Sequence, residues 1–132
     1  MKALAISLLA LLLPAPALAR VLTLNCQYES LYEATKGGSE SPMSGGFSAI
    51  LHMNELPGVA RIETTILGCL VYVGGFDRQE VAGDCVRIGV GGAKIKETLT
   101  INRINGEFER TALIGQSYMI YSGRCAVAKK LF

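Results

Sequence analysis

The residues of this chain best suited to chemistry are its four cysteines, Cys26, Cys69, Cys85 and Cys125. Thiols can either pair as disulfides or bind zinc. Zinc sites need closely spaced cysteines, with further Cys or His residues completing the shell. Here 42, 15 and 39 residues separate successive cysteines, and His52 is the single histidine. The spacing therefore favours two disulfides over a metal site.

Catalysis by a Ser-His-Asp or Cys-His set needs a histidine beside a nucleophile and an orienting carboxylate. His52 lies on the polar side of the alternating segment 47–54, which indicates a surface residue of a strand. Glu107 and Glu109 alternate along a solvated strand face, where nothing in the sequence supplies a partner that would raise a pKa. The five tyrosines are expected to provide half-buried packing. We expect no catalytic residues and no enzymatic activity.

Two patterns suggest binding of an anion. The run Gly89-Val90-Gly91-Gly92-Ala93-Lys94 is glycine-rich, but it lacks the spacing and the following helix of a phosphate-binding loop. It therefore indicates a turn, and we expect no cofactor. Arg103 and Arg110 lie near each other across a predicted hairpin, where they could clamp an anion, and they are the candidate binding residues.

The elements that must position these residues are strands. Glycines, including four Gly-Gly pairs, separate short runs rich in Val, Ile, Leu, Thr and Tyr. Glycine marks turns because it adopts positive φ without steric cost. The runs predict about eight strands, over residues 21–28, 47–54, 59–67, 69–73, 84–90, 93–104, 107–114 and 118–128. Residues 31–46 are polar and predict a long loop.

The order of these strands indicates an all-β fold. Short strands joined by short turns predict an antiparallel meander closed as a small barrel or folded as a sandwich. Parallel units need crossover helices, which the pattern lacks. Asn105-Gly106 favours a two-residue type I′ hairpin turn, which would pair Arg103 with Phe108 and Ile101 with Arg110.

Four cysteines allow three disulfide pairings. In a closed meander the first and last strands become neighbours, and these strands carry Cys26 and Cys125. Cys69 and Cys85 fall on strands that follow each other in the sequence. Because a disulfide needs Cα atoms within roughly 4.4–6.8 Å, we expect the pairs Cys26–Cys125 and Cys69–Cys85.

The N-terminus predicts export. Lys2 precedes an unbroken apolar run over residues 3–13, which ends at Pro14 and Pro16 and is followed by Ala17-Leu18-Ala19. A positive start, a short apolar core and an A-x-A site define a secretory signal peptide. The run is too short to span a bilayer, which takes roughly 20 apolar residues.

Cleavage after Ala19 gives a signal peptide of residues 1–19 and one β-rich domain of residues 20–132. The domain keeps 12 basic residues against 11 acidic ones, because only Lys2 leaves with the signal. This balance argues against a nucleic-acid partner, which would require a basic patch. No later segment is long and apolar enough to span a membrane, so we expect a periplasmic or secreted protein.

The C-terminal third resembles a group of short, uncharacterised, exported β-rich proteins of Gram-negative bacteria. Their tail contains a strand ending in Ile-x-Arg-x-x-Gly, a second strand with Gly-x-Cys, and a terminal Phe. Here these are Ile101-Asn102-Arg103-Ile104-Asn105-Gly106, Gly123-Arg124-Cys125 and Leu131-Phe132, with Cys26 as the early cysteine. The resemblance implies a bacterial envelope protein and no particular activity.

A second likeness is to the periplasmic inhibitors of c-type lysozyme, which are also small disulfide-containing β-barrels with signal peptides. Their inhibitory loop carries Ser-Gly-x-x-Tyr, whereas this chain has Tyr121-Ser122-Gly123-Arg124-Cys125 without the motif's tyrosine. The likeness therefore implies the architecture alone.

These observations favour a non-catalytic exported domain that binds an envelope protein or a glycan. One form of this hypothesis is an inhibitor of the protein that it binds. Two alternatives stay open: a small periplasmic enzyme that uses carboxylate, Arg and Tyr residues, and a structural component of the envelope. A deep pocket lined by Glu and Arg would favour the enzyme.

The mature protein is expected to begin at Arg20, because signal peptidase cleaves after the small-x-small pattern that ends at Ala19. Mass spectrometry of the protein recovered from its producing cells gives the N-terminal peptide directly. Retention of Met1 or Lys2 would contradict export by a cleaved signal.

Overall fold

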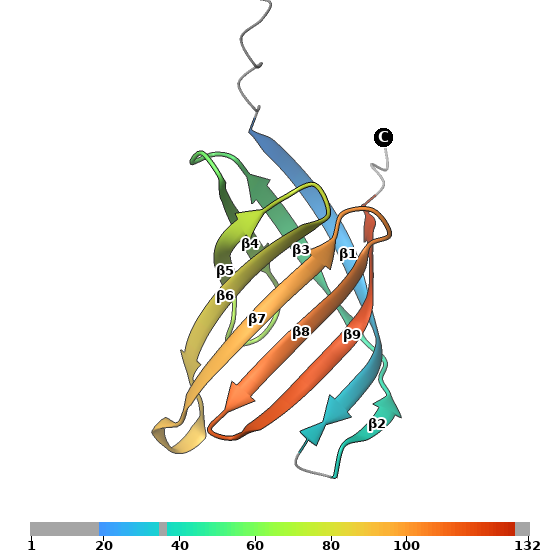
Figure 1. The fold of residues 1–132 in the computed structure, drawn as a ribbon, viewed down its shortest axis with the longest axis vertical. Coiled ribbons are helices and arrows are strands. Elements are labelled where there is room, and N and C mark those ends of the chain that lie inside the picture. The colour runs from blue at the N-terminus through green and yellow to red at the C-terminus, as the bar shows by residue number, and fades with distance from the viewer. Residues whose placement is uncertain (1–18, 35–36, 129–132) are drawn as a thin grey trace, which may run out of the picture.

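The computed structural model describes residues 19–34 and 37–128 (Figure 1). The predicted signal peptide therefore lies outside the described residues, apart from Ala19. The described chain forms nine strands and one 3-10 turn, η2. They are β1 (Arg20–Glu33), β2 (Ser39–Pro42), β3 (Gly46–Met53), β4 (Val59–Thr64), β5 (Val71–Phe76), β6 (Glu80–Ile88), η2 (Val90–Gly92), β7 (Lys94–Asn102), β8 (Glu107–Ile114) and β9 (Ser117–Val127).

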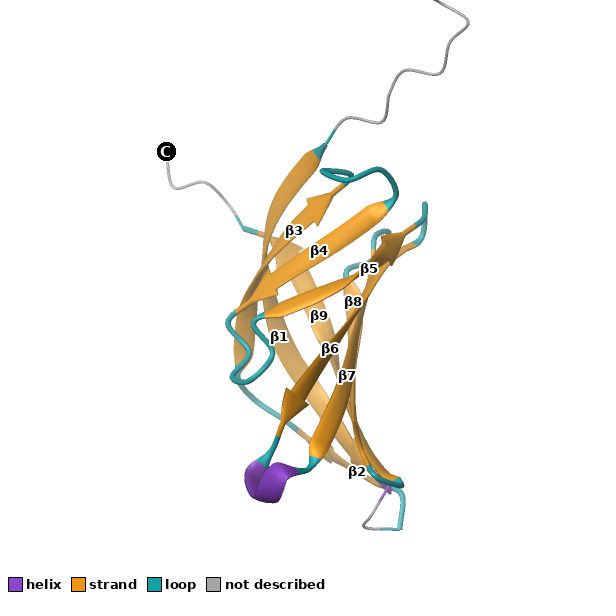
Figure 2. Cartoon of the chain, turned by 90° about the vertical axis from the view of Figure 1, so that its left-hand side faces the viewer, coloured by secondary structure: helices purple, strands orange, loops and turns teal. Residues whose placement is uncertain are grey.

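The strands close into an antiparallel barrel. Each strand from β3 to β8 pairs with the one that follows it, and β1 pairs with β3 on one side and with β9 on the other. Eight strands thus form the barrel wall, while β2 pairs with the far end of β1 alone (Figures 1 and 2). The predicted all-β meander is confirmed in its barrel form.

Alternation along the strands fills the barrel interior. In β7, for example, Ile95, Glu97, Leu99 and Ile101 are buried, and the residues between them are partly or fully exposed. The ring of Tyr28 lies 5.5 Å from that of Phe47 and 5.6 Å from that of Phe108, measured between centroids. These rings and the aliphatic residues around them form the core.

Two inward-facing glycines make room for large side chains on the neighbouring strands. Gly123 lies opposite Phe108, and a Cβ atom at position 123 would approach the Phe108 ring to 2.8 Å. Gly83 lies beside Tyr72, and a Cβ atom there would come within 3.0 Å of the Tyr72 side chain. Gly123 thus leaves room for the Phe108 ring and for the Gln27 carbonyl oxygen of β1, which would lie 2.0 Å from the added Cβ, and Gly83 leaves room for the backbone and the Cβ of Tyr72.

The hairpin between β7 and β8 differs from the prediction. Ile101 pairs with Phe108 and Leu99 pairs with Arg110, so the loop has four residues rather than two. The Asn102 side chain accepts hydrogen bonds from the backbone N–H groups of Ile104 and Asn105, which stabilises this wider loop. The observed register is two residues from the predicted one, so every side chain keeps its expected face.

The prediction of a long loop over residues 31–46 was wrong in part. β1 continues to Glu33, and β2 folds back against it with Tyr32 opposite Glu40. The same part of β1 also pairs with β9, placing Leu31 opposite Tyr121. Pairing on both sides extends the strand through a polar segment that carries little strand signal of its own.

Both expected disulfides are present. Cys26 bonds to Cys125, directly opposite it where β1 and β9 close the barrel. Cys69 bonds to Cys85, but Cys69 lies in the loop before β5 and not in a strand. The ladder between β5 and β6 ends at the pair Val73 and Asp84, so this second disulfide ties the loop to β6 where the ladder has ended.

Loss of the Cys26–Cys125 disulfide should lower the melting temperature more than loss of Cys69–Cys85. The two bridges join residues 99 and 16 positions apart. In the chain-entropy account they contribute about 4.7 and about 3 kcal/mol. Thermal unfolding of the two double Cys→Ser variants tests this order. A larger loss in the Cys69→Ser/Cys85→Ser variant would contradict it.

Candidate functional site

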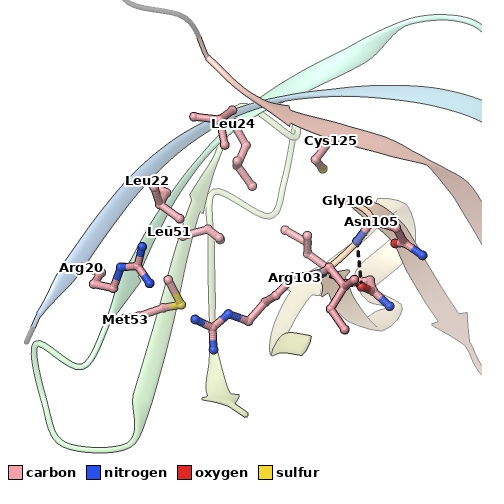
Figure 3. A pocket seen from close by; sticks show the side chains of 13 residues that line it. Arg20, Leu22, Leu24, Leu51, Met53, Arg103, Asn105, Gly106 and Cys125 are labelled. Carbon is pink, nitrogen blue, oxygen red and sulfur yellow. Dashed lines mark hydrogen bonds between the residues drawn. The ribbon is translucent and has the colours of Figure 1, made fainter. Parts of the chain in front are cut away.

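A pocket of about 390 Å³ opens at the barrel end where β1 begins and where the β7–β8 loop lies (Figure 3). Its walls are mainly aliphatic, and its polar groups come from Arg20, Asn102, Arg103 and Asn105. The remaining lining residues are Leu22, Leu24, Leu51, Met53, Ile101, Ile104, Gly106, Cys125 and Val127.

The local sequence explains the apolar walls. Residues two apart in a strand face the same way, so Leu22 and Leu24 of β1 and Leu51 and Met53 of β3 line one wall. The register places Leu22 directly opposite Leu51. Cys125 adds the disulfide to the lining, so the bond that closes the barrel also supports the pocket.

Gly106 sets the position of the β7–β8 loop. Its φ is 78°, and a Cβ atom at this position would lie 2.3 Å from the carbonyl oxygen of Cys125. The Cys125 N–H donates a hydrogen bond to the Gly106 carbonyl at 2.7 Å. Only glycine combines this backbone conformation with this close approach.

Arg103 is held at the rim of the pocket by the β5–β6 turn. Its guanidinium Nη1 donates to the carbonyl oxygen of Asp77, and its backbone N–H donates to the carbonyl of Gln79 at 2.7 Å. The guanidinium carbon lies 5.8 Å from the centroid of the Phe76 ring. Figure 3 shows the Arg20 and Arg103 side chains flanking Met53 at the same pocket.

Within the described residues, no carboxylate forms an ion pair with Arg20 or Arg103. No Asp or Glu lines the pocket either. The arrangement suits binding of an anion that carries an apolar group. It offers no carboxylate for acid–base chemistry.

Arg110 is absent from this pocket and belongs to a buried cluster in the barrel interior. Glu97 is fully buried; its Oε1 accepts from Arg110 Nε at 2.5 Å, and its Oε2 accepts from Arg87 Nε at 2.6 Å. The Tyr72 hydroxyl donates to Glu97 Oε1 at 3.1 Å. Arg110 also donates to the Tyr28 hydroxyl at 3.3 Å.

The predicted clamp of Arg103 and Arg110 is therefore not formed. Arg110 lies opposite Leu99, and Leu99 precedes Arg103 by four positions along the chain. The Arg110 guanidinium forms an ion pair with Glu97. It also lies 4.5 Å from the centroid of the Tyr121 ring. Arg103 remains a candidate binding residue at the pocket, whereas the Arg110 side chain is engaged in the interior.

The ionisation of the buried cluster follows from its contacts. Burial by itself would raise the pKa of Glu97, but hydrogen bonds from Arg110 and Arg87 outweigh it and hold the pKa below its ordinary value. Burial would lower the pKa of Arg110, and the hydrogen bond and charge of Glu97 raise it instead. Burial raises the pKa of Tyr72 above its ordinary value. Glu97 and Arg110 are thus charged, and Tyr72 is neutral, at neutral pH.

The sequence interpretation did not identify Glu97, although a signal was present. Glu97 lies in phase with Ile95, Leu99 and Ile101, which form the apolar side of their strand. A carboxylate on an apolar face must find a cationic partner inside the protein. Arg110 is in phase with the buried Phe108 and is that partner.

His52 lies on the outer face of β3, as predicted, and is enclosed by charged groups. Its Nδ1 is 2.8 Å from Glu55 Oε1, and its Nε2 is 3.5 Å from Glu63 Oε1. Arg61 forms ion pairs with both carboxylates. The hydrogen bond from His52 holds the pKa of Glu55 below its ordinary value. This is a surface network with no nucleophile in it.

Comparisons of the chain with protein-family models, with curated proteins and with solved structures found no match. Among the described residues, no group of three or more His, Cys, Asp or Glu side chains is placed to hold a metal ion. The described part of the chain also contains no helix long and apolar enough to cross a membrane. The chemistry of the site must therefore be inferred from its own residues.

Glu97→Gln should destabilise the protein by about 3–5 kcal/mol, because it leaves the buried Arg110 and the partly buried Arg87 without their carboxylate. Urea unfolding of wild type and variant gives the difference in the free energy of unfolding. Glu109→Gln, on the exposed face of β8, is the matched control, and its free energy of unfolding should lie within about 0.5 kcal/mol of the wild-type value. Because the folded pKa of Glu97 is depressed, its contribution is complete above the ordinary value of 4.5 and is lost as pH falls through the folded pKa.

The difference in the free energy of unfolding between wild type and Glu97→Gln should therefore become smaller as pH falls below about 4.5. A difference that stays constant down to strongly acidic pH would show that the pKa of Glu97 is the same in the folded and unfolded protein, and would contradict the depressed pKa.

Proposed function

We propose that this protein is an exported, non-catalytic binding domain that takes an acidic, partly apolar group of a bacterial envelope protein into the pocket at the end of its barrel. The observation that carries the proposal is the pocket itself. It has aliphatic walls, and Arg20 and Arg103 at its rim form no ion pair within the described residues. The Arg103 guanidinium already donates to the Asp77 carbonyl oxygen and interacts electrostatically with the Asp77 carboxylate, so it is the remaining N–H groups of Arg103, together with Arg20, that would meet an incoming anion.

The dimensions of the pocket suit a small group. Ligand pockets commonly measure about 300–1,000 Å³, and a pocket of about 390 Å³ is at the lower end of that range. A protein partner could insert an acidic side chain together with a neighbouring aliphatic one. The carboxylate would accept hydrogen bonds from a guanidinium, while the aliphatic group would bury against Leu22, Leu51 and Met53.

Export is the second part of the proposal. The leader pattern of residues 1–19 supports it, and so do two disulfides, because disulfides persist in oxidising compartments such as the periplasm. A periplasmic or secreted location would bring the pocket into contact with envelope proteins.

Binding is favoured over catalysis by the state of the buried carboxylate. An acid or base must reach the proton that it transfers. Glu97 is fully buried, is hydrogen-bonded to two arginines and Tyr72, and does not line the pocket. The alternative of a small enzyme would need this cluster to open to substrate.

A protein partner is favoured over a glycan because no aromatic side chain lines the pocket, and aromatic rings are the groups on which sugar faces stack. Inhibition of the bound protein is one outcome that such binding would have. Ser122 and Gly123 lie within β9, and Gly123 is buried, so they do not form a projecting loop of the kind found in lysozyme inhibitors. An inhibitory contact would therefore involve the pocket end of the barrel.

Hexanoate, a small carboxylate with an aliphatic tail, should bind the pocket more tightly than hexanol. An NMR titration should show chemical-shift changes centred on the amides of Leu22, Met53 and Ile104. Arg103→Gln should weaken hexanoate binding about tenfold, because it removes a charge-assisted hydrogen bond. Arg124→Gln, at an exposed arginine of β9, is the matched control and should bind as wild type does.

The same pair of variants tests the natural partner. Wild type and Arg124→Gln should capture the same protein from envelope extract, whereas Arg103→Gln should not, and added hexanoate should compete with the capture. Absence of shifts at the pocket with either probe would favour the structural-component alternative. Shifts centred on Glu97 and Arg87 would favour the enzyme.

A further inference from the structure

The barrel end opposite the pocket carries a projecting apolar tip. β6 and β7 are joined there by the glycine-rich turn of residues 89–93, at the lower end of the barrel in Figure 1. Val86, Ile88 and Val90 follow one another at two-residue spacing and are 55%, 68% and 102% exposed. Single exposed aliphatic residues are common on protein surfaces, but three in succession toward a tip form a continuous apolar ridge.

The backbone of the tip is ordered by its own hydrogen bonds. The Gly89 N–H donates to the Ala93 carbonyl at 2.7 Å, and the Gly92 N–H donates to the Gly89 carbonyl at 3.2 Å. Gly91 and Gly92 have φ values of 78° and 80°, which favour glycine. The glycine-rich run therefore forms a hydrogen-bonded turn that presents Val90 to solvent.

Lysines lie directly beside the apolar ridge. Lys96 is opposite Val86 and Lys94 is opposite Ile88, and both lysines are exposed. Lys96 is in turn opposite Leu113 of β8, and Leu113 is opposite Tyr118 of β9, so these side chains lie at the same level of the barrel as Val86. Leu113 and Tyr118 are 43% and 37% exposed.

Charge changes sign along the outer faces of these strands. Asp84 and Thr98 lie one step from the Val86–Lys96 pair, toward the pocket. Glu109 lies opposite Thr100, further still in the same direction. On the outer faces of β6, β7 and β8, the carboxylates are thus toward the pocket end and the lysines are at the tip. Beyond Tyr118 on the same level of the barrel, its ring lies 6.0 Å from that of Tyr32. Two carboxylates lie in this region, Glu33 opposite Met119 and Glu40 opposite Tyr32.

We propose that this tip docks on an anionic lipid bilayer, with Val90 and Ile88 inserted among the upper acyl chains and Lys94 and Lys96 at the headgroup phosphates. An apolar projection with a basic collar is complementary to a bilayer surface, which is negative outside and apolar within. Lysine is a compact charge on a flexible stem, so it suits phosphates whose positions are not fixed. Tyr118, which is amphipathic and partly exposed, suits the same interfacial layer.

A bilayer is favoured over a soluble protein by the shape of the surface. A specific protein interface needs a broad complementary area, with a total of roughly 1,200–2,000 Å² buried by the two partners. The ridge of Val86, Ile88 and Val90 ends in a single fully exposed side chain, and the exposed Val71 and Val73 of the neighbouring strand β5 add further apolar surface on the side away from β7. Such a tip penetrates a fluid layer without needing a shaped partner.

The chain contains no tryptophan, so one introduced at the tip is an unambiguous probe. The experiment compares Val90→Trp with Leu56→Trp in the purified protein. Leu56 is 67% exposed in the β3–β4 turn at the opposite end of the barrel. With vesicles of equal parts phosphatidylglycerol and phosphatidylcholine, the Val90→Trp emission should shift to the blue and gain intensity. The Leu56→Trp emission should not change.

Co-sedimentation of the protein with the same vesicles measures the affinity. Lys94→Glu/Lys96→Glu and Val90→Asp should each reduce the partition coefficient about tenfold, whereas Leu56→Asp should not. Binding should weaken with added salt and on vesicles of phosphatidylcholine alone. Circular dichroism confirms that each variant is folded.

The proposal is overturned if wild type does not sediment with anionic vesicles at low salt. It is also overturned if Leu56→Trp shifts in place of Val90→Trp, or if a soluble envelope protein binds the tip and no lipid does. Hexanoate binding at the pocket is measured without lipid, so failure here leaves the pocket result unaffected.

Discussion

Closure of the sheet between β1 and β9 is the constraint on which the rest of the structure depends. A closed barrel divides every strand into an inner and an outer face, and a slip of one residue would exchange the two. Such a slip would bring outward carboxylates such as Glu109 inside and expose Glu97. The Cys26–Cys125 disulfide crosses this seam at a directly opposed pair, so it holds the register as well as the closure.

The closed barrel is filled rather than hollow. Eight strands enclose an interior just wide enough for side chains, and aromatic rings occupy the part near Tyr28, Phe47 and Phe108. The Glu97 cluster links consecutive strands, because its arginines come from β6 and β8 on either side of β7 and its tyrosine comes from β5. Space for a ligand therefore remains at the end of the barrel. In the proposed arrangement that end faces away from the bilayer, since the pocket and the apolar tip lie at opposite ends of β7.

The expected strands and the observed ones agree best where alternation and turn residues act together. The segments around Phe47 and Phe108 alternate clearly and form β3 and β8. The loop around Asn105 was predicted as a turn, but its length was not, because the Asn102 side chain bonds to the loop backbone and stabilises a wider turn. Tyr32 and Glu40 lie in strands despite a weak local pattern, because β1 is paired on both sides there.

The sequence by itself determined most of the strand-forming segments outside residues 31–46, the alternation of faces within them and, through the meander order, which cysteines meet. Those properties depend on residues close together in the chain or on the order of the strands. The tertiary structure alone decided what gathers inside and at the ends. Arg110 and Tyr28 are 82 residues apart, yet they are hydrogen-bonded, and Arg20 meets Arg103 at one pocket. Alternation fixes a face but not a neighbour across the barrel, because that neighbour depends on how far each strand is staggered when the sheet closes.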